Sequence, residues 1–126
     1  MASDLYDKGM KVRREVLGDD YVDRALASVD DFTREFQQMV TEHAWGAIWT
    51  RPGLARKQRS LITLAILAAL NRLEEFELHF RGALRNGCTR EELKETLLHI
   101  AVYCGMPAGV AAFRVARKVL AETKPG

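Results

Sequence analysis

Residues 87–107 read GCTREELKETLLHIAVYCGMP and carry the clearest helix signals in the chain. Thr89, followed three residues later by Glu92, forms a capping box, which predicts that a helix begins at this point. Gly87 suits the left-handed end of a preceding helix, and Gly105 stops the new helix in the same way. The stretch therefore predicts the junction of two helices and the full extent of the second one.

Outward from this stretch, helix breakers divide the chain into about six helical segments, and no alternating strand pattern occurs. The segments are expected near residues 4–17, 19–45, 55–71, 73–86, 89–104 and 107–121. In the long second segment, apolar residues recur at spacings of three and four, which is typical of an amphipathic helix. We therefore expect an all-α fold.

Composition limits the class of protein. The chain has 126 residues, 48% of them hydrophobic, and a formal net charge of +2, so one globular domain over residues 1–126 is expected. Because basic residues are interleaved with acidic ones and form no single-sign block, no nucleic-acid partner is expected. Leu61–Leu70 is too short to span a membrane, so it predicts a buried helix, either central or in a subunit interface. The first residues are no signal peptide, which favours a cytoplasmic protein.

The two cysteines, Cys88 and Cys104, have neither Cys-x-x-Cys nor zinc-ligand spacing. We expect both to be free thiols packed as small apolar side chains. The three histidines lie in different predicted helices, so no metal site is expected.

Glu75 and His79 are the most suggestive pair of polar residues, because side chains four residues apart on a helix can touch. The carboxylate can fix the tautomer of the imidazole and support its protonated form. A half-exposed pair without a function is the alternative. Glu77, four residues before Arg81, is expected to form an ordinary surface ion pair.

His99 and Tyr103 are one turn apart on the next helix, away from its core face, so they face either solvent or a cleft. Arg51 lies in a connection between helices, where an arginine suits bidentate recognition of a carboxylate. Arg59 is expected to be half-buried and to need a partner. Trp49 is expected to anchor the core or an interface.

The chain resembles the carboxymuconolactone decarboxylase family, on the combined order and spacing of several runs. These are Gly9-Met10-Lys11-Val12-Arg13, Trp49-Thr50-Arg51-Pro52-Gly53-Leu54, Arg59-Ser60-Leu61, Glu75-Phe76-Glu77-Leu78-His79, Ala83-Leu84-Arg85-Asn86-Gly87, Thr89-Arg90-Glu91-Glu92-Leu93 and Leu98-His99-Ile100-Ala101-Val102-Tyr103-Cys104-Gly105-Met106-Pro107-Ala108. Alkylhydroperoxidases of the same superfamily carry a Cys-x-x-Cys pair before a histidine that His79 matches. Here Arg72 and Glu75 replace those cysteines, so thiol redox chemistry is not expected.

The resemblance implies an alkylhydroperoxidase-like helical fold and a ring-like homo-oligomer, specifically a hexamer. It implies cofactor-free loss of carbon dioxide from γ-carboxymuconolactone to give the β-ketoadipate enol-lactone, in protocatechuate degradation. Within that reading, His79, oriented by Glu75, donates the proton or stabilises the oxyanion. Alternatives are another lactone substrate, a peroxidase-like relative or a non-catalytic oligomeric module.

The remaining site residues follow from the same resemblance. Arg51, with Arg59 as a weaker candidate, is expected to bind a carboxylate of the lactone substrate. Trp49 is expected to wall the pocket. His99 and Tyr103 are expected to supply further hydrogen bonds, with His99 as a second candidate for the proton.

Overall fold

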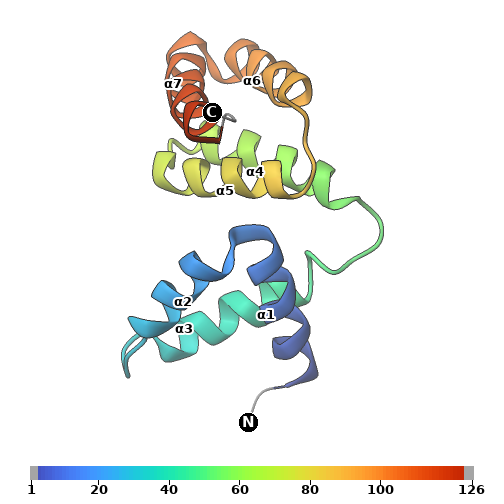
Figure 1. Cartoon of the computed structure of the whole chain (residues 1–126), viewed down its shortest axis with the longest axis vertical. Coiled ribbons are helices and arrows are strands. Elements are labelled where there is room, and N and C mark those ends of the chain that lie inside the picture. The colour runs from blue at the N-terminus through green and yellow to red at the C-terminus, as the bar shows by residue number, and fades with distance from the viewer. Residues whose placement is uncertain (1–2, 124–126) are drawn as a thin grey trace. The chain divides into compact units, whose positions relative to one another are not determined.

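The computed structural model describes residues 3–123, which form seven α-helices, one π-helix and no strand. The all-α prediction is confirmed. The helices are α1 (Asp4–Leu17), α2 (Asp19–Ala27), α3 (Arg34–Met39), the π-helix η1 (Val40–Gly46), α4 (Arg56–Ala69), α5 (Leu73–Arg85), α6 (Arg90–Cys104) and α7 (Met106–Thr123). They form two compact units, Met1–Arg56 and Lys57–Gly126, which are described separately (Figure 1).

In the first unit, α1 packs against η1 through two glycines. A Cβ atom on Gly9 would lie 2.0 Å from the carbonyl oxygen of Thr41, and one on Gly46 would lie 2.5 Å from the carbonyl oxygen of Leu5. The two backbones therefore touch, and no larger residue fits at either position. Gly18, with φ of 90°, ends α1 where the sequence predicts.

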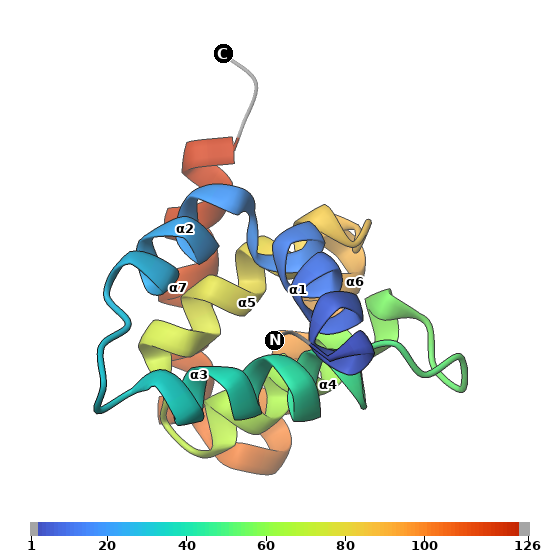
Figure 2. The same ribbon diagram turned by 90° about the horizontal axis from the view of Figure 1, so that it is seen from below.

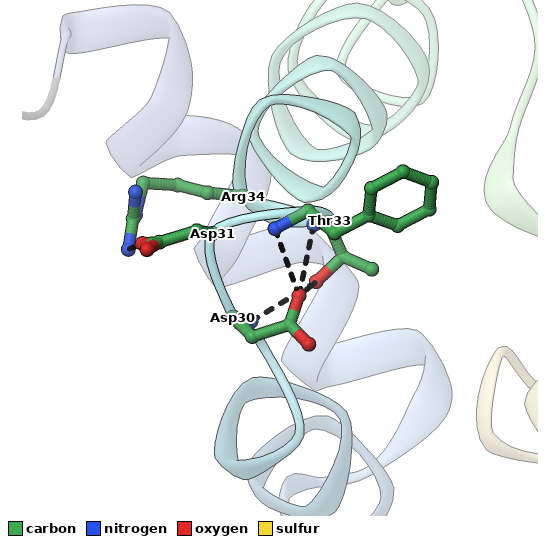
Figure 3. Close-up of polar contacts among 5 residues, drawn as sticks. Asp30, Asp31, Thr33 and Arg34 are labelled. Atoms are coloured by element: carbon green, nitrogen blue, oxygen red, sulfur yellow. Dashed lines mark hydrogen bonds and ion pairs between the residues drawn. The ribbon is translucent and has the colours of Figure 1, made fainter.

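The predicted long helix over residues 19–45 is wrong, because the chain leaves the helix after Ala27 and enters α3 only at Arg34 (Figure 2). Side chains take over backbone hydrogen bonds in this gap. The Ser28 hydroxyl donates to the carbonyl of Ala25 at 2.9 Å. The Asp30 carboxylate accepts from the N–H groups of Phe32 and Thr33 at 3.0 and 3.1 Å (Figure 3). Such local bonds compete with helical ones and break an otherwise continuous apolar pattern.

After α3 the chain widens into the π-helix. The N–H of Ala47 donates to the carbonyl of Glu42 at 2.8 Å, and that of Trp49 to the carbonyl of Ala44 at 3.0 Å, both across five residues. Such helices are rare and occur often at functional sites. This one brings Trp45 and Trp49 into a stacked contact with ring centroids 4.9 Å apart.

In the second unit, α7 packs against both α5 and α6. The core consists of buried apolar side chains from all four helices, among them Leu64, Phe76, Phe80, Leu93, Leu97, Ile100, Ala112 and Val119. Gly87, with φ of 89°, follows α5, and the capping box of Thr89 and Glu92 starts α6. The predicted junction is therefore confirmed.

The expectation that Leu61–Leu70 is buried on all sides is wrong for the chain by itself. Leu64 is fully buried, but Ile62, Ile66 and Leu70 are 46%, 52% and 62% exposed. Only one face of α4 meets the core of its unit, so the other face keeps an apolar surface. The alternative that this helix lies in a subunit interface stays a prediction.

Candidate active site

Helix α5 presents its apolar face to the core and thereby fixes the direction of its polar residues. Phe76, Phe80 and Ala83 are fully buried, as the helical periodicity predicts. Glu75 is exposed and His79 is half-buried one turn later, at the edge of that buried face. The structure thus places the candidate pair at the border between core and surface.

His79 is held in its neutral form. Burial lowers its pKa to about 4 from an ordinary value of 6.5, and the Glu75 carboxylate raises it against that larger effect. Since desolvation dominates, the imidazole is uncharged at neutral pH. A neutral imidazole has one N–H donor and one acceptor nitrogen. As expected, the Glu75 carboxylate favours the protonated form of His79, but burial outweighs it, so the neutral form prevails.

The predicted ion pair of Glu77 and Arg81 is confirmed, with a nitrogen–oxygen distance of 3.0 Å. It is part of a larger cluster, because Lys118 of α7 reaches Glu77 at 3.2 Å and Glu122 reaches Arg81 at 2.7 Å. The hydrogen bonds from Arg81 and Lys118 hold the pKa of Glu77 below its ordinary value. The cluster links α5 to α7, and the Glu77 carboxylate is bound by both Arg81 and Lys118.

His99 and Tyr103 lie together on α6, with ring centroids 4.8 Å apart, and both are exposed. His99 also lines an open hollow of about 360 Å³ between α4 and α6, beside Leu61 and Glu95. Of the two predicted settings for this pair, the structure therefore shows both in part: an exposed aromatic pair next to a hollow.

The other candidates are distributed over both units. In the first unit, Trp49 is buried at 9% exposure in its stack with Trp45, and Arg51 is exposed in the connection that follows. In the second unit, Arg59 lies in the first turns of α4, half-buried, with its Nε atom inside the protein. Its predicted burial is confirmed.

Both cysteines are free thiols, as predicted, but only Cys88 is buried, and burial raises its pKa. Cys104 is exposed, so its expected packing is wrong. Cys88 lies just before α6 and Cys104 is its last residue, so the length of this helix, about 20 Å at 1.5 Å per residue, separates them. Because a disulfide needs Cα atoms within about 7 Å, they cannot form a redox pair within one chain.

Residues 3–123 contain neither a metal-binding cluster nor a membrane-spanning helix. No group of three or more His, Cys, Asp or Glu side chains is placed to hold a metal ion. No helix in this part of the chain combines the length and apolar character that crossing a membrane requires.

A helical fold with a half-buried histidine one turn after a glutamate agrees with the class of protein that sequence comparison identifies. The chain belongs to the carboxymuconolactone decarboxylase family, whose model matches residues 34–118. The resemblance noted in the sequence is thereby confirmed.

Three relatives with high sequence identity are named as decarboxylases. The nitrosuccinic acid decarboxylase npaB of Metarhizium robertsii is 49% identical over 116 residues, which are 92% of this chain and 81% of that protein. The 4-carboxymuconolactone decarboxylase of Acinetobacter baylyi is 45% identical over 117 residues, 93% of this chain and 87% of that protein. A 4-carboxymuconolactone decarboxylase of Pseudomonas putida is 61% identical over 41 residues, 32% of this chain and 85% of that protein. These matches support a decarboxylase of this family.

Proposed function

We propose that the chain catalyses the cofactor-free decarboxylation of 4-carboxymuconolactone (γ-carboxymuconolactone) to the β-ketoadipate enol-lactone and carbon dioxide, as a step of protocatechuate degradation. The observation that carries the proposal is the 45% identity to the Acinetobacter baylyi enzyme over almost the whole chain. The half-buried neutral His79 beside Glu75 supplies a group with the required chemistry.

Decarboxylation of nitrosuccinate is the second candidate, because the relative named for it is 49% identical over 92% of the chain. The two substrates share more than the reaction. In each, the departing carboxylate is on a carbon that also bears a CH₂-carboxylate arm, so both are substituted succinates. In each, that carbon is conjugated or bonded to an electron-accepting group: the unsaturated lactone in one, the nitro group in the other.

The shared reaction balances without an external electron acceptor. The bond to the carboxylate breaks, carbon dioxide leaves, and the electron pair moves onto the acceptor group. The lactone gives a dienolate and the nitro compound gives a nitronate, both with negative charge on oxygen. A proton then adds to carbon. The protein has to bind the carboxylate arm, stabilise the oxyanion and permit that protonation.

We assign oxyanion stabilisation to the neutral N–H of His79, positioned by Glu75. One well-placed donor of this kind contributes about 10²–10³ in kcat. Arg51 is assigned to a substrate carboxylate, with Arg59 as the weaker candidate, and Trp49 to exclusion of water from the pocket. His99 and Tyr103 are assigned further hydrogen bonds, and His99 stays the second candidate for proton delivery.

A homo-oligomer, in particular a hexamer, belongs to the same proposal. The exposed apolar side chains of α4 support it, since large apolar patches on a small protein favour association. A cytoplasmic location stays a prediction.

The experiment compares both substrates on the purified chain, following carbon dioxide release and substrate absorbance. We expect turnover of 4-carboxymuconolactone, and a loss of kcat of about 10²-fold or more in His79→Gln. Glu75→Gln should lower kcat less. Glu74→Gln is the matched control, because Glu74 is an exposed neighbour on the same helix turn.

Turnover of nitrosuccinate alone would move the assignment to the second candidate. No turnover of either compound by a folded oligomer would refute both. Full activity of His79→Gln would remove His79 from the chemistry.

A further inference from the structure

Arg13 is a buried cation in the first unit, on the face of α1 that meets η1. It is 4% exposed. Its Nη1 atom donates to the hydroxyl of Thr41 at 3.3 Å, and its Nε atom is buried without a hydrogen-bond partner. Within residues 3–123 it forms no ion pair with a carboxylate.

This environment leaves the charge of Arg13 uncompensated. A guanidinium carries five N–H donors and stays protonated at neutral pH. Thr41 cannot balance the charge, because it is neutral and its own hydroxyl donates to the carbonyl of Gln37 at 2.9 Å. The tyrosines Tyr21 and Tyr6 favour the charged form, but burial is the larger effect and lowers the pKa of Arg13.

The adjacent Arg14 shows how this unit ordinarily satisfies an arginine. Its Nη1 atom contacts Asp19 at 3.1 Å and Asp23 at 2.8 Å. Burying a cation without such a partner is costly, and the cost is offset when an anion completes the site. Arg13 therefore has an unsatisfied donor in a desolvated setting, as an anion site requires. Arg14 does not, because carboxylates already occupy its donors.

The frame around Arg13 is rigid and unusual. Gly9 lets the backbone of α1 touch the carbonyl of Thr41, which fixes the distance between the two helices. Thr41 belongs to the π-helix, a rare geometry that occurs often at functional sites. The π-helix and the under-satisfied arginine are independent features, and they meet at one side-chain contact.

We propose that Arg13 anchors a carboxylate-binding site in the first unit, built by α1 and η1, which recognises small dicarboxylates of the succinate type. The class of ligand rests on the proposed function, whose two candidate substrates are both substituted succinates. The guanidinium offers paired N–H donors that match the two oxygens of a carboxylate.

The test uses succinate itself, which has both carboxylates and lacks an electron-accepting group, so that binding is measured without turnover. Calorimetric titration of the wild-type oligomer should show binding. Arg13→Met should weaken it about 10- to 100-fold, the usual effect of losing hydrogen bonds to a charged group. Arg14→Met is the matched control and should retain the wild-type affinity, because Arg14 already has its own carboxylate partners.

Equal succinate affinity in wild type and a folded Arg13→Met would overturn the proposal. If Arg13→Met does not fold, Arg13→Lys keeps the charge and removes the planar fork; an unchanged affinity there would overturn it as well. Absence of succinate binding to wild type, with a stability that depends on Arg13 and on protein concentration, would assign the carboxylate to a second copy and refute a small-molecule site. If the chain decarboxylates neither candidate substrate but still binds succinate through Arg13, the proposed function fails and this carboxylate site stands.

Discussion

The low pKa of His79 makes stability depend on pH in a way that one substitution isolates. The imidazole titrates near 6.5 when unfolded and at about 4 when folded. Between these pH values the unfolded chain binds a proton that the folded chain does not, so the free energy of unfolding decreases as pH falls. The contribution is therefore complete above pH 6.5 and is lost progressively toward pH 4.

The size of the effect follows from the two pKa values. At about pH 5, the ratio of the unfolded to the folded binding polynomials is about 30, and RT times its logarithm is about 2 kcal/mol. At about pH 7.5 the same quantity is near zero. Since His79 keeps part of its surface in solvent, about 2 kcal/mol is an upper value.

The assay is urea unfolding followed by far-ultraviolet circular dichroism, at fixed protomer concentration and at about pH 7.5 and pH 5. Wild type should lose up to about 2 kcal/mol more than His79→Gln over this interval. His43→Gln is the control, because His43 is exposed on η1. The lowered pKa values of Glu77 and Glu92 act mainly below this interval and cancel in the comparison. Parallel pH dependence in wild type and His79→Gln would refute the reasoning.

Further predictions concern the surface and the local structure. Ile66→Glu should dissociate the proposed oligomer, because it places a charge on the exposed apolar face of α4, whereas Lys94→Glu on α6 should not; sedimentation velocity separates these outcomes, and an intact Ile66→Glu oligomer would exclude α4 from the interface. Thr89→Ala removes the capping box of α6 and should lower the free energy of unfolding by about 1 kcal/mol, measured by urea titration; an unchanged midpoint would contradict it. Asp30→Ala should speed hydrogen exchange at the amides of Phe32 and Thr33, and unchanged exchange there would show that the carboxylate does not hold this turn.

Where the sequence predicted the fold well, the signal was local. The capping box at Thr89, and the glycines at 18, 87 and 105, each act within a few residues, so their structural consequences do not depend on distant packing. The break between α2 and α3 involves equally local bonds from Ser28 and Asp30. Periodicity alone predicts one continuous helix here, because the apolar spacing of three and four continues through the break and does not reveal that these side chains bind the backbone.

For the candidate site too, local features were predictable from the sequence and features that depend on distant packing were not. The spacing of Glu75 and His79 was enough to predict that they share a helix face, because four residues complete about one turn. The charge state of His79 was not predictable, since it depends on how much of the imidazole other helices cover. Arg13 lay within a recognised run of the family pattern, yet its burial and its single hydrogen bond to Thr41 arise only when α1 meets η1.

The two relatives with different substrates constrain how the site can work. A dienolate and a nitronate differ in shape, but both develop negative charge on oxygen and both retain a carboxylate arm. A neutral imidazole at His79 can donate to either oxyanion, so that residue does not by itself distinguish the substrates. An arginine that binds the CH₂-carboxylate group likewise suits both substrates. If the proposed function holds, discrimination between a lactone ring and a nitro group therefore rests on residues other than His79 and that arginine. For this reason the identity of the polar residues supports the reaction class, and the substrate comparison decides the compound.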